Sequence, residues 1–393
     1  MRPEVHYETD ATAEPVFGLA DNLPTTFPYS TVSTWIMTNS DMIAQEILDR
    51  IENLPQNRHR IRPDIETSKS LRDIRFHLSY LAEALIHQDA TLFLDYIEWV
   101  KVLFKGLDIG DEALLVTLQS TSAVIKKHVE QAGWTLVDDL LRQGIERLDV
   151  APDTIDSFIQ AEMPLSSLSN RYLDALLAGQ RRVAHEIVMD AMASGKATVR
   201  ELYLHVFQRS QYEIGRLWQT NKVSVAQEHY CTAATQLIMS QLYPYIFTSK
   251  RINRQMIAAS IGGELHELGI RMVADFFEME GWDTHYLGAN TPEATILETV
   301  AEKKPDLLAI SATITYNVRS VAQLIAALRK DANTKQIKIL VGGYPFNASP
   351  TLWQQIGADG FAPDAEAATV RAAELVGLNP DAANGSPGTR QTV

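Results

Sequence analysis

The chain has 393 residues, 46% of them hydrophobic, and a formal net charge of -14 at pH 7. This length and composition suffice for the cores of two or three globular domains. The acidic balance argues against a nucleic-acid surface, which needs clustered Lys and Arg, so we expect no direct contact with DNA or RNA.

Cysteine content and apolar runs indicate a cytoplasmic protein. Cys231 is the single cysteine and cannot form an internal disulfide, and the N-terminal stretch MRPEVHYETD lacks the pattern of an export signal. No apolar run approaches the roughly 20 residues that cross a bilayer. We therefore expect no direct membrane role.

The first part of the chain is expected to be an irregular, proline-containing arm over residues 1–30, followed by helices. From residue 41 to about residue 162, apolar residues recur three or four positions apart, which is typical of amphipathic helices. This spacing predicts an all-helical domain over residues 31–163.

A second helical unit follows a stretch with a proline and serines, MPLSSLSNRY, which reads as a hinge. Helices are expected over 171–193, 198–218 and 225–247, the first of them split at Gly179. Segments of this length with short connections predict a four-helix bundle over residues 164–250.

Short apolar runs alternate with helical stretches after residue 251. The runs are MIAASI, THYLGA, LLAISATI, KILVGG and GFAP. Strands that are apolar on both faces and separated by helices are typical of parallel sheets with right-handed crossovers. The pattern predicts a five-stranded, doubly wound parallel sheet over residues 251–377, and we expect residues 378–393 to be a disordered tail.

A histidine stands where the first predicted strand gives way to a helix, in GGELHELGIRM. Ligands of open parallel sheets bind at the carboxyl ends of the strands, where His266 falls. The nearby glycines do not have the GxGxxG spacing, and no Gly-Lys-Ser/Thr follows, so dinucleotide and phosphate-loop sites fit poorly. A lone histidine here is more often a surface or capping residue. Glu264, however, can accept from one ring nitrogen and leave the other as a basic metal ligand.

Three spaced motifs resemble the signatures of cobalamin-binding domains. They are Glu264-x-His266-x-x-Gly269, Ser311-Ala-Thr313 and Gly342-Gly343, where that family most often has Asp-x-His-x-x-Gly, Ser-x-Thr and Gly-Gly. The resemblance implies a Rossmann-like domain in which His266 is the lower ligand of cobalt and Glu264 orients it. It also implies that the displaced nucleotide tail of the cofactor passes the Ser/Thr and glycine positions.

The predicted bundle holds a further motif, in which nine residues separate Trp218 from Glu228-His229. This spacing resembles that of the light-dependent cobalamin repressors and implies that the three side chains cover the upper face of adenosylcobalamin. Trp218 would end one helix and Glu228-His229 would begin the next. Gln219 stands where photoreceptors of that class can have a histidine, which leaves His229 as the candidate for an alternative upper ligand.

The segment from Leu71 to Ile109 resembles the globin-like domain of photocobilins, which binds biliverdin. Because Cys231 lies outside this domain, a bilin would be held without a covalent bond. The candidate contacts for this second pigment are polar and aromatic residues of one predicted helical pair: Arg75, His77, Tyr80, Tyr96 and Trp99.

These resemblances predict a light-sensing photoreceptor, not an enzyme, with adenosylcobalamin and biliverdin as cofactors. It would signal to an unknown effector protein by changing its domain packing or by forming a light-dependent homo-oligomer. Two alternatives stay open: a corrinoid methyl-carrier protein that passes a methyl group between methyltransferases, and a light-independent cobalamin sensor. A mutase would need a substrate barrel of about 250 residues, for which the chain has no segment.

Overall fold

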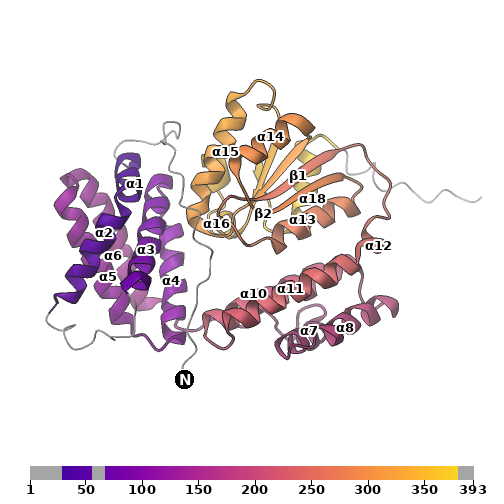
Figure 1. Ribbon diagram of the computed structural model, residues 1–393, viewed down its shortest axis with the longest axis horizontal. Coiled ribbons are helices and arrows are strands. Elements are labelled where there is room, and N and C mark those ends of the chain that lie inside the picture. Colours follow the sequence, from indigo (N-terminus) through magenta and orange to yellow (C-terminus); the bar gives the residue numbers. More distant parts are fainter. Residues whose placement is uncertain (1–28, 55–66, 379–393) are drawn as a thin grey trace, which may run out of the picture. The chain divides into compact units, whose positions relative to one another are not determined.

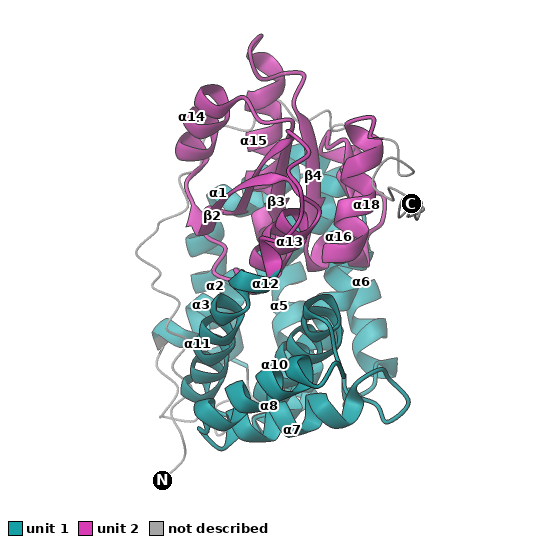
Figure 2. Ribbon diagram, turned by 90° about the vertical axis from the view of Figure 1, so that its right-hand side faces the viewer, with its two compact units in different colours: residues 1–245 teal, residues 246–393 magenta. Residues whose placement is uncertain are grey.

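The computed structural model describes residues 29–54 and 67–378. The chain divides into two compact units, residues 1–245 and 246–393, coloured teal and magenta in Figure 2. The predicted arm falls outside the described residues except for its last two, which open the first helix, and the predicted tail falls outside them except for Leu378.

Six helices make up the first part of unit 1 (Figure 1). They are α1 (Tyr29–Thr38), α2 (Ser40–Glu52), α3 (Thr67–His87), α4 (Thr91–Gly106), α5 (Asp111–His128) and α6 (Gln131–Val150). Their buried leucines and isoleucines recur at helical spacing, so each helix turns one apolar face inward. Lys101 is buried as well, and its ammonium donates to the carbonyls of Leu148 and Ala151 at the end of α6, 2.8 and 2.7 Å away. The stretch is helical as predicted, but its globin-like character is not confirmed.

The rest of unit 1 is a helical bundle. It contains α7 (Ser166–Leu177), α8 (Arg181–Ala193), α9 (Val199–Glu201), α10 (Gln208–Gln219) and α11 (Val225–Gln241). The short helix α12 (Tyr243–Ile246) follows and ends at the first residue of unit 2. Gly179, with φ +70°, separates α7 from α8 at the predicted position. A π-helical stretch, Leu202–Phe207, joins α9 to α10, and the carbonyl of His205 within it accepts a hydrogen bond from Ser169 Oγ at 2.7 Å. The α7 helix therefore supplies a partner for a backbone group in the widened turn.

Unit 2 contains the predicted five-stranded parallel sheet. Its strands are β1 (Gln255–Ile261), β2 (Asp283–Thr291), β3 (Leu307–Ser311), β4 (Lys338–Gly342) and β5 (Gly360–Phe361). They lie in the order β2-β1-β3-β4-β5, and every pair is parallel. The order reverses between β1 and β3, so these two neighbours send their connections to opposite sides of the sheet.

Helices cover the sheet on both faces. They are α13 (Leu268–Met279), α14 (Glu293–Lys303), α15 (Val318–Lys330), α16 (Tyr344–Ala348), α17 (Leu352–Gln355) and α18 (Ala365–Leu375). Met256 and Ala258 of β1 belong to the core cluster that contains Ile270 and Phe277 of α13 and Ala368 of α18. Alternate residues of a strand point to opposite faces, so one set of strand residues packs against α13 and α18.

The third strand is shorter than its apolar run predicts. LLAISATI continues to Ile314, but β3 ends at Ser311. The backbone N–H groups of Thr313 and Ile314 donate to the carboxylate of Glu264 instead of continuing the ladder. A side chain from another loop thus ends the strand, which hydrophobicity alone does not reveal.

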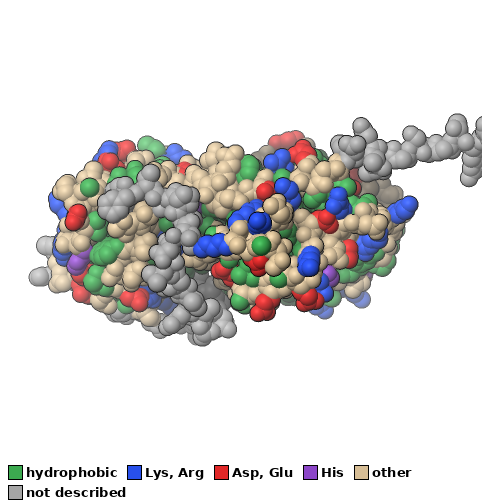
Figure 3. All heavy atoms as spheres, turned by 90° about the horizontal axis from the view of Figure 1, so that it is seen from above, with side chains coloured by type: hydrophobic (Ala, Val, Ile, Leu, Met, Phe, Trp, Pro, Cys, Tyr) green, Lys and Arg blue, Asp and Glu red, His purple; other side chains and the backbone are tan. Residues whose placement is uncertain are grey.

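Charge and hydropathy of the described residues agree with the composition. Lys and Arg side chains share the face shown in Figure 3 with Asp and Glu side chains. Among the described residues, no helix combines the length and the apolar character needed to cross a bilayer.

Gly343, between β4 and α16, lies very close to the loop that follows β3, and a substitution there tests this close approach. Its φ of +109° and ψ of 174° lie in a region open essentially to glycine alone, and a Cβ there would lie 2.0 Å from the carbonyl oxygen of Ala312. We expect Gly343→Ala to lower the free energy of unfolding by about 2–4 kcal/mol, measured by urea denaturation. Gly377→Ala has positive φ but no atom within 4 Å of the added Cβ, and should cost about 1 kcal/mol. Equal losses in the two variants would contradict the close approach.

Candidate functional site

The loop after β1 places a carboxylate inside unit 2. Gly263 has φ +84°, which lets the chain turn sharply after the strand, and its N–H donates to Asn290 Oδ1 at 2.8 Å. The side chain of Glu264 is fully buried as a result. It lies at the carboxyl ends of the strands, on the side of the sheet where parallel folds bind ligands.

Both carboxylate oxygens of Glu264 have donors. Oε1 accepts from the backbone N–H of His266 at 3.0 Å and pairs with His266 Nδ1 at 2.5 Å. Oε2 accepts from the N–H groups of Thr313 and Ile314 at 2.6 and 2.9 Å, and from Asn317 Nδ2 at 3.1 Å. One side chain therefore joins the loop after β1 to the loop after β3.

These donors keep the carboxylate charged. Burial by itself raises the pKa of Glu264, but the hydrogen bonds and charge of His266 and the N–H of Ile314 outweigh it, so the pKa lies below its ordinary value of 4.5. An ionised Glu264 accepts Nδ1–H of His266, so the ring lone pair lies on Nε2.

The imidazole of His266 points away from the core. Its side chain is 59% exposed although its partner is fully buried. At Gly269, the second residue of α13, an added Cβ would have no neighbour within 4 Å, so the helix surface is open there. Leu265, in the loop after β1, and Tyr344, the first residue of α16, expose 50% and 54% of their surfaces at this edge. The edge thus combines a basic nitrogen, an open helix surface and exposed apolar side chains, a combination that suits a large flat ligand.

The two other motifs of unit 2 meet at the same edge. Ser311 ends β3 directly opposite Gly342, which ends β4. The N–H of Ala312 donates to the carbonyl of Gly342 at 3.0 Å, and Gly343 lies against the backbone of Ala312. The structure therefore brings the residues of all three predicted motifs together at one edge: Glu264, His266, Gly269, Ser311, Thr313, Gly342 and Gly343.

The bundle residues occupy the predicted helix ends. Trp218 lies in the last turn of α10, and Glu228 and His229 lie in the first turns of α11, which a capping box of Ser224 and Gln227 starts. His229 is 64% exposed, and its Nδ1 pairs with Glu228 at 2.5 Å. The spacing of nine residues thus reflects a helix end, a tight turn and a capped helix start.

Four of the five candidate bilin contacts lie in one aromatic cluster of α3 and α4. Tyr96 bonds to His77 Nδ1 at 2.8 Å and stacks on Tyr80 at 3.7 Å between ring centroids, and Trp99 lies 6.4 Å from Tyr96. Burial lowers the pKa of His77 to about 4. Arg75 is not part of the cluster, because its guanidinium pairs with Asp41 at 2.6 Å. The rings of Tyr80 and Tyr96 thus stack on each other, whereas Trp99 at the end of the cluster stays 39% exposed.

Comparison with known families gives matches for the α/β domain and for the helical bundle. Residues 254–373 match the B12 binding domain, and residues 168–243 match a second model that is also described as a B12 binding domain. The chain contains cobalamin-binding domains. The matches cover the α/β domain with its three motifs and the bundle with Trp218, Glu228 and His229.

Several named relatives are corrinoid proteins. The chain is 24% identical over 191 residues to dimethylamine corrinoid protein 2 of Methanosarcina acetivorans, covering 49% of this chain and 82% of the relative. It is 26% identical over 190 residues to trimethylamine corrinoid protein 1 of the same organism, covering 47% and 86%. The solved structure of the Methanosarcina barkeri monomethylamine corrinoid protein is 21% identical and covers 53% of this chain and 98% of that one, with a TM-score of 0.48.

These relatives overturn the predicted photoreceptor function. They are named for methylamines and corrinoids, which favours the alternative of a corrinoid methyl carrier. The tryptophan motif misled because its spacing is a property of the helix turn, and the bundle matches a general B12 binding model. Cobalamin or corrinoid binding stands, whereas the adenosyl form, biliverdin and the light-dependent homo-oligomer have no support.

Sequence patterns missed the residues that hold Glu264 in place. Asn317 and the N–H groups of Thr313 and Ile314 follow β3 by a few residues, and nothing in their sequence shows that they converge on a carboxylate. Asn290, near the end of β2, was also missed although its Oδ1 accepts from the N–H of Gly263. Its positive φ is visible only in the structure, so the sequence held no signal for it.

Glu264→Gln tests the buried carboxylate. The amide cannot satisfy all the N–H donors, so we expect the free energy of unfolding at pH 7 to fall by about 2–4 kcal/mol. Because the pKa of Glu264 is lowered in the folded chain, its contribution is fully present above about pH 4.5 and is lost as the pH falls through the lowered pKa. Urea unfolding at several pH values should show the difference between wild type and variant shrinking in acid. Glu302→Gln on exposed α14 is the control, and a difference that grows in acid would contradict the assignment.

Gly269→Leu separates stability from binding. Leucine has a better helix propensity than glycine and the position is open, so we expect the unfolding free energy to rise by about 0.5–1 kcal/mol. The same side chain would occupy the space that the nucleotide tail needs, so corrinoid binding should weaken. Urea unfolding and equilibrium dialysis with hydroxocobalamin measure the two effects. Ala301→Leu on α14 is the control, and unchanged affinity in Gly269→Leu would show that the tail does not pass this helix.

Proposed function

We propose that the chain is a corrinoid protein that carries a methyl group between methyltransferases and is not an enzyme by itself. The observation that carries the proposal is the Glu264–His266 pair, which lies within a region matching a B12 binding domain. The methylamine corrinoid relatives support the carrier role over a light-independent cobalamin sensor.

The residues at the sheet edge fit a corrinoid. His266 would be the lower ligand through Nε2, with its other nitrogen bound to Glu264. Gly269 would leave room for the nucleotide tail, which would continue past the motif residues of the two neighbouring loops: Ser311, Thr313, Gly342 and Gly343. When bound, the cobalt would supply the chemistry by accepting a methyl group from one partner and giving it up to a nucleophile on another.

The contribution of Glu264 is to control one proton. Its Oε1 lies 2.5 Å from Nδ1 of His266, so the shared proton can lie closer to either atom. Movement of the proton toward the carboxylate makes Nε2 a stronger donor, and movement toward the ring makes it a weaker one. The donors to Oε2 limit how far Glu264 takes up the proton, because they stabilise its charged form. This pair would let the ligand strength follow the arrival and departure of the methyl group.

The contribution of the bundle is to cover the opposite face. Trp218 offers an apolar ring that excludes water, which limits loss of the carried group to solvent. Glu228 accepts from Thr232 at 2.9 Å, and Thr232 in turn donates to Gln211 of α10 at 3.1 Å. Glu228 is thus held between α10 and α11. His229 pairs with Glu228, and we assign it to the rim of the cover and not to the cobalt.

Methyl transfer from the loaded protein tests this function. Full-length protein carrying methylcobalamin is mixed with a thiol acceptor and a corrinoid-dependent methyltransferase, and loss of the methylcobalamin absorption band is followed in darkness. We expect transfer at least about tenfold faster than from the same concentration of free methylcobalamin, because the protein presents the cofactor to its partner. His266→Ala should retain corrinoid at least about tenfold more weakly and lose the histidine-ligated spectrum.

His285→Ala provides the matched control. His285 lies on β2 opposite Ile257, away from the carboxyl end of the strand, so its loss should alter neither the spectrum nor the transfer rate. If the protein binds methylcobalamin tightly but transfers the methyl group no faster than the free cofactor does, the result would point to a sensor. Protein that retains no corrinoid would contradict the site itself.

A further inference from the structure

The last turn of α4 lies directly against the end of α10. Gly106 is the final residue of α4, and a Cβ there would lie 2.9 Å from the carbonyl oxygen of Gln219 and from the carbonyl carbon of Thr220. Both helices belong to unit 1. The glycine therefore allows the two helix ends to meet backbone to backbone.

Two neighbouring residues at the end of α10 contact the same tryptophan of α4. Gln219 is 5% exposed, and its Nε2 donates to the carbonyl of Trp99 at 2.9 Å. The ring of Trp218 lies 6.1 Å from the ring of Trp99, at an interplanar angle of 31°. This separation is within the range of favourable aromatic pairs. Trp99 is thus in contact with the tryptophan of the bundle motif.

Trp99 also contacts the other aromatic residues of the cluster of α3 and α4. Its ring lies 6.4 Å from Tyr96, whose hydroxyl bonds to His77 at 2.8 Å. The ring of Tyr80 stacks on the ring of Tyr96, with 3.7 Å between the two centroids. A ring held by this cluster can limit the orientations open to Trp218, whereas an isolated exposed ring would not.

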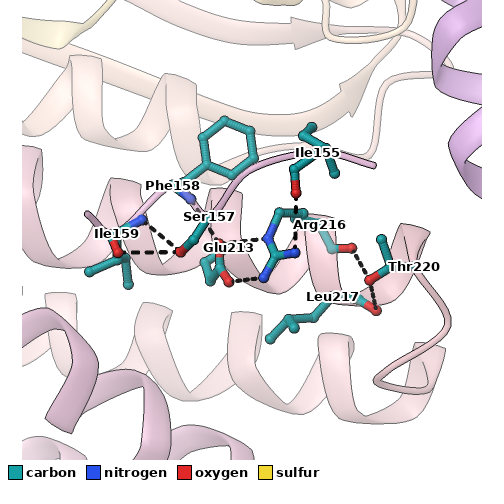
Figure 4. A network of polar contacts seen from close by, with 8 residues as sticks. All are labelled: Ile155, Ser157, Phe158, Ile159, Glu213, Arg216, Leu217 and Thr220. Atoms are coloured by element: carbon teal, nitrogen blue, oxygen red, sulfur yellow. Dashed lines mark hydrogen bonds and ion pairs between the residues drawn. The ribbon is translucent and has the colours of Figure 1, made fainter. Parts of the chain in front are cut away.

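The α10 helix is also attached to the segment that follows α6. Glu213 accepts from the N–H of Phe158 at 2.9 Å and from two nitrogens of Arg216, and Arg216 donates to the carbonyl of Ile155 at 3.4 Å (Figure 4). The pKa of Glu213 is lowered because Arg216 and the N–H of Phe158 outweigh its burial. The segment that connects α6 to α7 is therefore fixed along α10, and the helix is held both near its middle and at its end.

We propose that Trp99 is a positioning residue for Trp218, through which the α1–α6 domain controls access of small molecules to the upper face of the bound corrinoid. This inference rests on the proposed function, in which Trp218 covers that face. Both B12 binding matches begin after residue 167, so the α1–α6 domain lies outside them. Its action on the cofactor would pass through contacts within unit 1 and would not require a ligand of its own.

Entry of a small upper ligand measures this control. Full-length protein is loaded with hydroxocobalamin, azide is added, and the rate of spectral change is recorded. Trp99→Ala removes the ring contact, so we expect azide to enter about 3- to 10-fold faster, as in Trp218→Ala. The double variant should be no faster than Trp218→Ala alone, because both substitutions remove one contact. Before azide is added, each variant should show the same His266-ligated spectrum as the wild type.

Further variants distinguish positioning from a general loss of stability. Trp99→Phe keeps an aromatic ring and should restore most of the wild-type rate, and Trp99→Leu keeps apolar volume without the ring and should behave as Trp99→Ala. Trp134→Ala is the control within the same domain, since its ring contacts Lys126 at 4.2 Å, and it should leave the rate unchanged.

The failures of the two proposals differ. If Trp218→Ala speeds azide entry while Trp99→Ala and Trp99→Leu do not, the positioning role is wrong and the proposed function stands. If the effects of Trp99→Ala and Trp218→Ala multiply in the double variant, the two residues act separately and the inference is also wrong. If wild-type protein retains no corrinoid, both the function and the inference fail.

Discussion

The buried carboxylate of Glu264 is the interaction on which the site depends. Its two oxygens join His266 to the backbone of Thr313 and Ile314 and to Asn317. These donors come from loops that follow β1 and β3, the neighbours at which the strand order reverses. Loops diverge from a sheet at such a point and leave a crevice. Glu264 joins the two loops at that point and thereby orients the imidazole of His266, which is 59% exposed.

The same contact explains why the fold was more predictable than the edge of the sheet. The apolar runs and the glycines located the five strands because burial and turn geometry act locally. The end of β3 was missed because it depends on a carboxylate more than 40 residues earlier in the chain. The residues of the three motifs were located because spacing relative to strand ends is local, whereas Asn317 joins the site only through tertiary structure.

The prediction of a photoreceptor was wrong for a related physical reason. A tryptophan, a short turn and an acid-histidine pair are what a tight helix connection places together, whichever group is carried beneath them. The spacing therefore indicates a tight helix connection and does not identify the group that binds beside it. Likewise, the rings of Tyr80, Tyr96 and Trp99 are spaced as ligand contacts would be, yet they pack against one another.

The position of the aromatic cluster suggests a role other than bilin binding, because the cluster contacts the end of α10. Trp99 contacts Trp218 through its ring and Gln219 through its carbonyl, and Gly106 removes the side chain that would separate the two helices. A domain attached by a flexible linker alone would need none of these contacts. Because the segment after α6 is also bound by Glu213 and Arg216, α10 is held near its middle as well as at its end. The α1–α6 domain and the bundle are therefore mechanically coupled at the residue that would cover the cofactor.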